Sequence, residues 1–189
     1  MRWSLCFAIL VGMSQSVTIV GAGLAGSEAA LQLADRGVRV RLVEMRPKTP
    51  TLVHVTGCCA ELVCSNSLKS EKPDSAAGML KRELAELGSQ LYAQAKLHAV
   101  PAGGALAVDR TAFAEAVTAL VEAHPLIDLV HEEVVDLVQA AEGADALVVA
   151  AGPLASDALA ASLSRLAGEE HLAFYDAAAP IVMADSLDY

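Results

Sequence analysis

The stretch VTIVGAGLAGSEAALQLADRGVRVRLVEM, residues 17–45, decides the fold of this 189-residue chain. Residues 17–20 are short, apolar and β-branched, which predicts a buried strand that ends at a glycine. Residues 24–37 place apolar side chains at helical spacing and end at another glycine, which is typical of a helix and its stop signal. Residues 38–45 return to a strand pattern. The order strand–helix–strand predicts a βαβ unit and therefore an α/β domain.

The turn between the first strand and the helix has the spacing G-x-G-x-x-G. In such a turn the first glycine permits a tight bend, the second lets the backbone approach a pyrophosphate, and the third lets helix and strand pack closely. The start of the helix offers unpaired N–H groups and the positive end of its dipole to phosphates. Glu44 ends the next strand 18 residues after the last glycine and is placed to accept both hydroxyls of an adenosine ribose. The predicted cofactor-binding residues here are Gly21, Ala22, Gly23, Leu24, Ala25, Gly26 and Glu44.

An acidic residue at the ribose position disfavours a 2′-phosphate, so this pattern favours FAD or NAD over NADP as the occupant. The alternative is a glycine-rich turn with a surface glutamate. Two later stretches, VDRTAF (108–113) and ALVVAAGP (146–153), are typical of flavoproteins, and Arg110 in the first of them is a further candidate cofactor contact. Taken singly, the first is better explained as a surface arginine and the second as an ordinary buried strand.

The rest of the chain predicts further alternation of helices and strands. The long irregular connection from residue 46 to 74 contains three prolines, and connections of this length are often functional. After it we predict a helix over 75–97, a glycine pair and a short strand over 100–110, a helix over 111–124, one or two strands over 127–138, a buried strand over 145–153 and a helix over 155–167.

Composition and charge argue against some classes of function, among them a protein that binds nucleic acid over its whole surface. The chain is 54% hydrophobic and carries a net charge of −10, so it lacks a basic nucleic-acid footprint at the level of the whole sequence. Residues 1–15 contain a short apolar run after Arg2 that is too short to span a membrane. We interpret this leader as an upstream start, with Met13 as the natural first residue; the alternative is a secretion signal.

Four cysteines raise the question of metal or redox chemistry: Cys6, Cys58, Cys59 and Cys64. If the protein is not secreted, its cysteines are expected to be free thiols and not disulfides. His54 and the three later cysteines are of the residue types that bind zinc, but no C-x-x-C pair is present, so we expect no metal site. Cys64 precedes a polar turn in AELVCSNSLKS (60–70), and the residues alone leave a nucleophile and a buried inert thiol equally open.

Four motifs in order, VTIVGAGLAGSEAALQLADRGVRVRLVEMRP (17–47), AELVCSNSL (60–68), VPAGGALAVDR (100–110) and FYDAAAPIV (174–182), resemble the bacterial folate- and FAD-dependent tRNA (uracil-5-)-methyltransferases, relatives of the GidA flavoproteins. The resemblance implies a Rossmann-like FAD-binding domain of the GR2 flavoprotein type. It also implies FAD as cofactor, methylenetetrahydrofolate as methylene donor, NAD(P)H as reductant and a uridine of the tRNA T-loop as the methylated base. The motif cysteine of that family corresponds to Cys64, which would add to C6 of uracil or shield the flavin during transfer.

The resemblance further implies a cytoplasmic protein with no membrane or DNA partner. Members of the family are roughly twice as long, so we expect this chain to be an N-terminal portion that is inactive alone. On this basis residues 1–15 are a leader, 16–170 the FAD-binding domain and 171–189 the start of a second segment. Cys58 and Cys59 depart from the family pattern. Two alternatives stay open: a generic FAD- or NAD-dependent oxidoreductase, and a non-catalytic remnant of the family.

Overall fold

The computed structural model describes residues 15–168 of the chain. In chain order its elements are β1 (Ser16–Val20), α1 (Leu24–Ala34), β2 (Arg39–Glu44), β3 (Ser67–Ser70), α2 (Ala76–Glu86), α3 (Gln90–Leu97), β4 (Ala99–Val100), β5 (Ala105–Val108), α4 (Arg110–Ala123), β6 (Ile127–His131), α5 (Leu137–Ala140), β7 (Ala146–Val149), the 3₁₀ turn η1 (Gly152–Leu154) and α6 (Asp157–Ala167).

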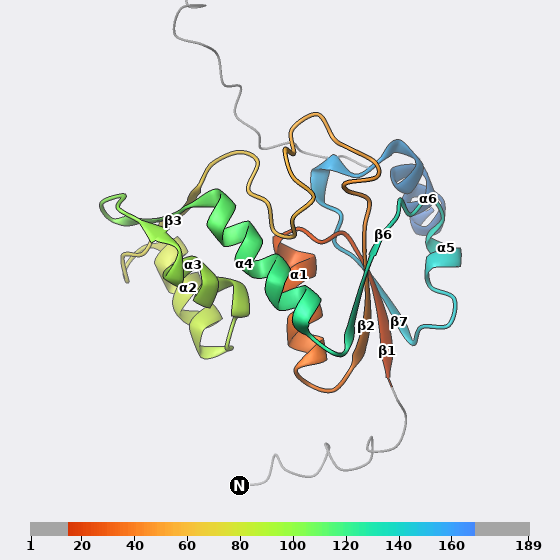
Figure 1. Ribbon diagram of the computed structural model, residues 1–189, viewed down its shortest axis with the longest axis horizontal. Coiled ribbons are helices and arrows are strands. Elements are labelled where there is room, and N and C mark those ends of the chain that lie inside the picture. The colour runs from red at the N-terminus through yellow and green to blue at the C-terminus, as the bar shows by residue number, and fades with distance from the viewer. Residues whose placement is uncertain (1–14, 169–189) are drawn as a thin grey trace, which may run out of the picture.

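A four-stranded parallel sheet forms the centre of the molecule, in the order β6-β2-β1-β7 (Figure 1). β1 pairs with β2 from Ser16 opposite Arg39 to Val20 opposite Val43. β6 lies on the far side of β2 and β7 on the far side of β1, both in parallel. This arrangement confirms the predicted βαβ unit and the α/β, Rossmann-like fold class.

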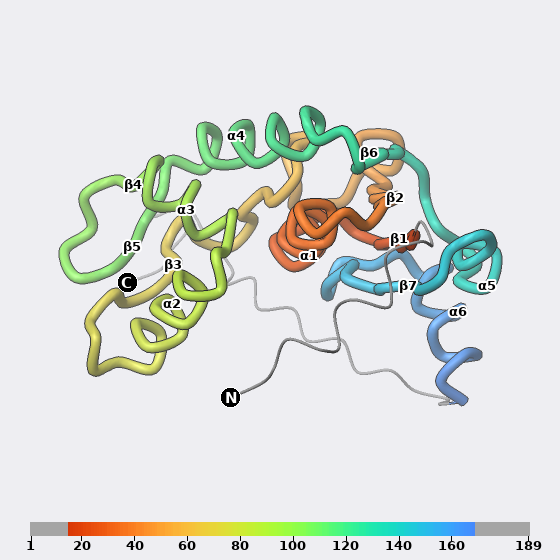
Figure 2. The backbone as a smooth tube through the Cα atoms, turned by 90° about the horizontal axis from the view of Figure 1, so that it is seen from below, coloured from red at the N-terminus to blue at the C-terminus, as the bar shows by residue number. Residues whose placement is uncertain are grey.

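Helices cover both faces of this sheet. α1 and α4 lie on one face, and α5 and α6 lie on the other, as Figures 1 and 2 show. The strands alternate accordingly: Ile19 and Leu42 are buried against the side of α1 and α4, whereas Val20 and Val43 are buried towards α5 and α6. Burial on both faces explains why residues 19–20 and 42–43, at the carboxyl ends of β1 and β2, are apolar at consecutive positions.

A second, antiparallel sheet, β3-β5-β4, lies beside α2 and α3 at the other end of the molecule (Figure 2). β3 falls inside residues 46–74, where we predicted only irregular structure. The helix predicted over 75–97 is instead two helices, because Gly88 adopts a left-handed φ of 73° and Ser89 caps α3 by accepting from the Tyr92 N–H.

Of the one or two strands predicted over residues 127–138, one forms, whereas the burial predicted for the strand over 145–153 needs correction. Residues 127–138 form one strand followed by the short α5, because the Asp136 side chain caps that helix by accepting from the N–H groups of Val138 and Gln139. β7 is a strand, as predicted, but it is not buried: Val148 and Val149 are 36% and 39% exposed. β7 pairs only with β1 within residues 15–168, which leaves its outer edge open.

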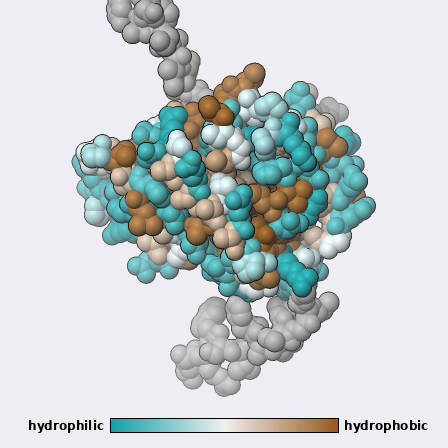
Figure 3. Space-filling model, viewed as in Figure 1, coloured by the Kyte–Doolittle hydropathy of each residue, from teal (hydrophilic) through white to brown (hydrophobic). Residues whose placement is uncertain are grey.

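The face shown in Figure 3 is mostly hydrophilic, with apolar side chains at several places on it. Over residues 15–168, no helix is long and apolar enough to cross a bilayer. Our interpretation of the leader, the cysteine Cys6, the motif at 174–182 and the segment 171–189 lie outside the described residues, so the proposed domain boundaries remain predictions.

Candidate functional site

Two of the three glycines in the turn after β1 are required by the fold itself. Gly21 has a φ of 99°, and a Cβ added to it would lie 2.7 Å from the carbonyl oxygen of Ala150. A Cβ on Gly26 would lie 1.8 Å from the carbonyl oxygen of Gly21. The glycine at position 21 therefore lets the turn pass close to the end of β7, and Gly26 lets α1 pack against the turn.

Gly23 is different, because neither the backbone nor the packing requires a glycine there. Its φ is −69°, which any residue adopts, and an added Cβ would meet no atom within 4 Å. It is the N-cap of α1, and no side chain accepts a hydrogen bond from the first turn of that helix. The start of α1 therefore presents its N–H groups to an open space. That space is open because Gly23 has no side chain to fill it.

Glu44 lies at the carboxyl end of β2 beside this turn and is 5% exposed. Its Oε2 accepts from the backbone N–H of Ala22 at 2.9 Å. Its Oε1 accepts from the backbone N–H and the Nε of Arg46, at 3.1 and 2.8 Å. Burial raises the pKa of Glu44, but the hydrogen bonds from Arg46 and Ala22 outweigh that effect and leave the pKa below its ordinary value. The group is a carboxylate with acceptor capacity left on Oε2 for a hydroxyl donor.

A small hollow opens between the glycine turn and Glu44, at the carboxyl ends of the parallel strands. This is the edge where open α/β sheets bind their ligands. Its lining comes from the ends of β1 and β2, the segments after β6 and β7, and the start of α6: Val20, Gly21, Val43, Glu44, Met45, Glu132, Glu133, Val134, Ala151, Ser156 and Leu159. Three of these residues are acidic, so the hollow suits a ribose better than a phosphorylated ribose.

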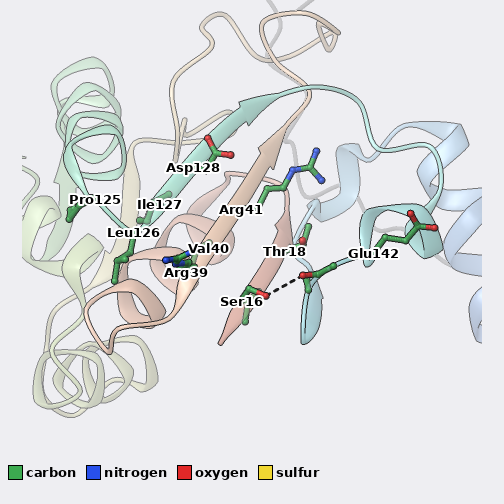
Figure 4. A pocket seen from close by; sticks show the side chains of 13 residues that line it. Ser16, Thr18, Arg39, Val40, Arg41, Pro125, Leu126, Ile127, Asp128 and Glu142 are labelled. Atoms are coloured by element: carbon green, nitrogen blue, oxygen red, sulfur yellow. Dashed lines mark hydrogen bonds between the residues drawn. The ribbon is translucent and has the colours of Figure 1, made fainter. Parts of the chain in front are cut away.

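A hollow of about 600 Å³ lies at the other edge of the same sheet (Figure 4). Ser16, Arg39 and Ile127, the first residues of β1, β2 and β6, line it together with Arg41 and Asp128. It is therefore at the amino ends of the strands. None of the residues of the glycine turn lines it, and the carboxyl edge remains the candidate cofactor site.

The structure places Cys64 in a bend three residues after Glu61, half-buried. The polar turn that follows it is tied to β5: the Asn66 side chain donates to the Val108 carbonyl at 3.1 Å, and the Val108 N–H donates to the Asn66 carbonyl at 2.9 Å. Ser65 accepts from the Ser67 N–H. The turn thus holds the thiol at the junction between the long loop and the second sheet.

Arg110 is exposed at the first position of α4. It lines a cleft with Cys58 and Glu61, between the long loop and α4, to which no residue of the glycine turn contributes. Its contact with a cofactor stays a prediction.

Sequence reasoning missed Arg46 and Glu61. Arg46 is 3% exposed, and its Nη1 donates to Glu61 Oε2 at 3.0 Å while its Nε holds Glu44. The only signal was a pair of opposite charges, one at the start of the long loop next to Glu44 and one in its middle. Buried charges of this kind are rare unless paired, so their position next to the turn is informative.

Cys58 and Cys59 are free thiols in different surroundings. Cys59 is buried, and its N–H donates to the Thr118 hydroxyl; burial raises the pKa of its thiol to about 11. Cys58 is half-buried. Within residues 15–168, no group of three or more His, Cys, Asp or Glu side chains is arranged to hold a metal ion.

A family model described as glucose inhibited division protein A matches residues 16–189. The chain is 54% identical over 176 residues to the methylenetetrahydrofolate--tRNA-(uracil-5-)-methyltransferase TrmFO of Bacillus licheniformis, and 56% identical over 176 residues to the protein of the same name from Geobacter sulfurreducens. Each alignment covers 93% of this chain and 39% of the relative. A solved structure, the GidA-related protein from Thermus thermophilus, aligns with 63% of this chain and 39% of its own, at 24% identity and a TM-score of 0.33.

Proposed function

This chain belongs to the glucose inhibited division protein A family, and from that premise we propose that it forms the FAD-binding portion of a methylenetetrahydrofolate--tRNA-(uracil-5-)-methyltransferase. Relatives that are 54–56% identical carry that name, and the chain spans 39% of their length. The whole reaction, its folate and its tRNA therefore belong to a protein of which this chain would supply the cofactor site.

The observation that carries the proposal is the contrast between Gly23 and its two neighbouring glycines. The fold requires Gly21 and Gly26, but only a ligand requires Gly23, because an added Cβ there would fill an empty space above the start of α1. A pyrophosphate approaching that space would accept hydrogen bonds from the first N–H groups of the helix. The adenosine ribose would then donate to Glu44 Oε2. The residues present therefore fit the ADP half of FAD.

The charge of the site selects among dinucleotides. Glu44 is a carboxylate at neutral pH, and Glu132 and Glu133 line the same hollow. A ribose 2′-phosphate would bring two negative charges towards these groups, so the site disfavours NADPH. We propose NAD(P)H as a reductant that acts on the bound cofactor from elsewhere.

When bound and reduced by NAD(P)H, FAD would supply the two electrons that turn the methylene group of the folate into a methyl group. In our proposal Cys64 acts on the tRNA. Its thiolate adds to C6 of the target uracil, forming an S–C6 bond and leaving C5 nucleophilic towards the one-carbon unit. C5 then bonds to the methylene carbon, and the bond from that carbon to the folate nitrogen breaks as the C5 proton is lost. Addition of a hydride equivalent to the same carbon and departure of the thiolate give the methylated base and free Cys64. We propose a cytoplasmic location for this reaction, since its substrate is a tRNA and its donor a folate.

A chimera tests this function. In the Bacillus licheniformis relative, the portion that aligns with residues 16–168 of this chain is replaced by those residues. Ribothymidine is then measured in an unmodified tRNA transcript supplied with FAD, methylenetetrahydrofolate and NADPH. We expect ribothymidine from the chimera and none from the same chimera with Cys64→Ala. A folded, FAD-binding chimera that makes no ribothymidine would contradict the proposed function.

A further inference from the structure

A buried ion cluster joins Glu44, the predicted ribose-binding acid, to the long loop over residues 46–66. Arg46 is almost completely buried between two carboxylates, with its Nε on Glu44 at 2.8 Å and its Nη1 on Glu61 at 3.0 Å. A guanidinium presents several donors in one plane and can hold two acceptors at fixed positions. The cluster has one positive and two negative charges, so both carboxylates are paired with the same guanidinium.

Glu61 in turn organises the loop that leads to Cys64. Its Oε1 accepts from the Val55 N–H at 2.7 Å, and its Oε2 accepts from the N–H and the hydroxyl of Thr56 at 3.1 and 2.7 Å. Arg46 adds a longer bond to the Thr56 carbonyl at 3.4 Å. Three residues after Glu61 the chain reaches Cys64. The closed shape of this loop therefore depends on the carboxylate that Arg46 holds.

A second tether ties the same loop to the glycine turn. The backbone N–H of Ala60 donates to the Ala22 carbonyl at 2.8 Å, and the Ser27 hydroxyl donates to that carbonyl at 2.9 Å. On its other side the Ala22 N–H donates to Glu44. Both polar groups of Ala22 are thus held by residues that are linked to the loop, directly through Ala60 or through Glu44 and Arg46.

We propose that the chain Glu44–Arg46–Glu61 couples the ribose site to the loop that carries Cys64, with Arg46 as the positioning residue. Arg46 holds the Glu44 carboxylate in position for the ribose only while Arg46 is also paired with Glu61 and the loop is folded around Glu61. A nucleotide that donates to Glu44 therefore favours the closed loop, and by linkage the closed loop favours the nucleotide. The inference rests on the proposed function only through the ADP-binding site.

The test measures how fast Cys64 reacts with iodoacetamide, with and without saturating ADP, in the 189-residue chain. Peptide mass spectrometry reports each cysteine separately. ADP is the probe because it occupies the turn and the ribose site but carries no flavin. For the wild type we expect ADP to slow the alkylation of Cys64 by at least about fivefold, the lower end of ordinary coupling between sites.

Variants distinguish coupling from direct shielding by the ligand. Glu61→Gln removes the charge that Arg46 holds at the loop, and we expect it to abolish the effect of ADP on Cys64 while ADP still binds. Arg46→Lys keeps a positive charge but cannot span both carboxylates. In this variant we expect weaker ADP binding, and we expect ADP not to change the alkylation rate of Cys64. Glu71→Gln is the matched control, because its carboxylate pairs with Lys96 outside the cluster, and it should behave as wild type.

The outcomes separate the two claims. If ADP binds but does not slow the alkylation of Cys64, or slows it equally in Glu61→Gln, the coupling is refuted and the cofactor site stands. If the wild type binds no ADP, the proposed cofactor site fails, and the coupling fails with it. Should Glu61→Gln not fold, Thr56→Val decides the question: it removes the hydroxyl bond to Glu61 and the acceptor of the Cys58 N–H, and leaves the three charges of the cluster in place. It must reduce the ADP effect clearly, and an undiminished effect would overturn the proposal.

Discussion

Replacing Gly23 with alanine should weaken FAD binding without weakening the fold. The new methyl group would meet no atom of the protein within 4 Å, and the φ of −69° suits alanine. Gly23 is a half-buried N-cap that has no capping side chain to lose, so we expect the free energy of unfolding to change by less than about 1 kcal/mol. The methyl would instead occupy the space that a pyrophosphate needs. We expect FAD affinity to fall at least about tenfold, equivalent to roughly 1.4 kcal/mol of binding free energy.

Gly26→Ala is the comparison, because this substitution should weaken the fold itself. Its Cβ would lie 1.8 Å from the Gly21 carbonyl oxygen, so α1 or the turn must move. Overpacking backbone against backbone should cost about 3 kcal/mol or more, which corresponds to a melting temperature lower by roughly 10 °C for a chain of this size. Urea unfolding and quenching of flavin fluorescence measure the two quantities. If Gly23→Ala binds FAD as tightly as the wild type, the pyrophosphate does not lie on this turn.

Three further predictions concern titratable side chains. The pKa values of Glu44 and Glu61 lie below the ordinary 4.5, so these carboxylates stabilise the fold above that pH and the contribution is lost as the pH falls through the folded-state values. Urea unfolding of Glu44→Gln should therefore show a deficit at pH 7 that shrinks in acid; a constant deficit would contradict this. Cys59, whose thiol pKa is raised to about 11 by burial, should resist iodoacetamide at pH 8 in the folded chain while Cys58 reacts, and equal rates would be evidence against its burial. Cys64→Ala in the chimera should lose roughly 1 kcal/mol of stability and all ribothymidine formation; normal formation would make Cys64 a packing residue.

The sequence predicted the parts of the fold that depend on local pattern. The βαβ unit, the glycine turn and the position of Glu44 follow from periodicity and spacing within about 30 residues, the span of such a unit. The break between α2 and α3 was also signalled locally, by Gly88 followed by the capping Ser89, and the apolar spacing over 75–97 concealed it.

The contacts of the long loop could not be predicted in the same way. Arg46 and Glu61 are 15 residues apart in a stretch without periodicity, and their ion pair forms only after the loop folds back over the turn. β3 was missed for a related reason, because Ser67–Ser70 is a polar segment that becomes a strand only by pairing with β5. Tertiary contacts decide both features.

The central claim, that this turn and Glu44 bind the ADP half of FAD, is tested most directly by comparing FAD with FMN. Both carry the same flavin, but only FAD carries the adenosine and the pyrophosphate that the site is built to hold. The chain should quench the fluorescence of added FAD at one site per molecule, ADP should displace it, and FMN should neither bind nor compete. Binding of FMN as tight as that of FAD, or no binding of FAD at all, would contradict the account.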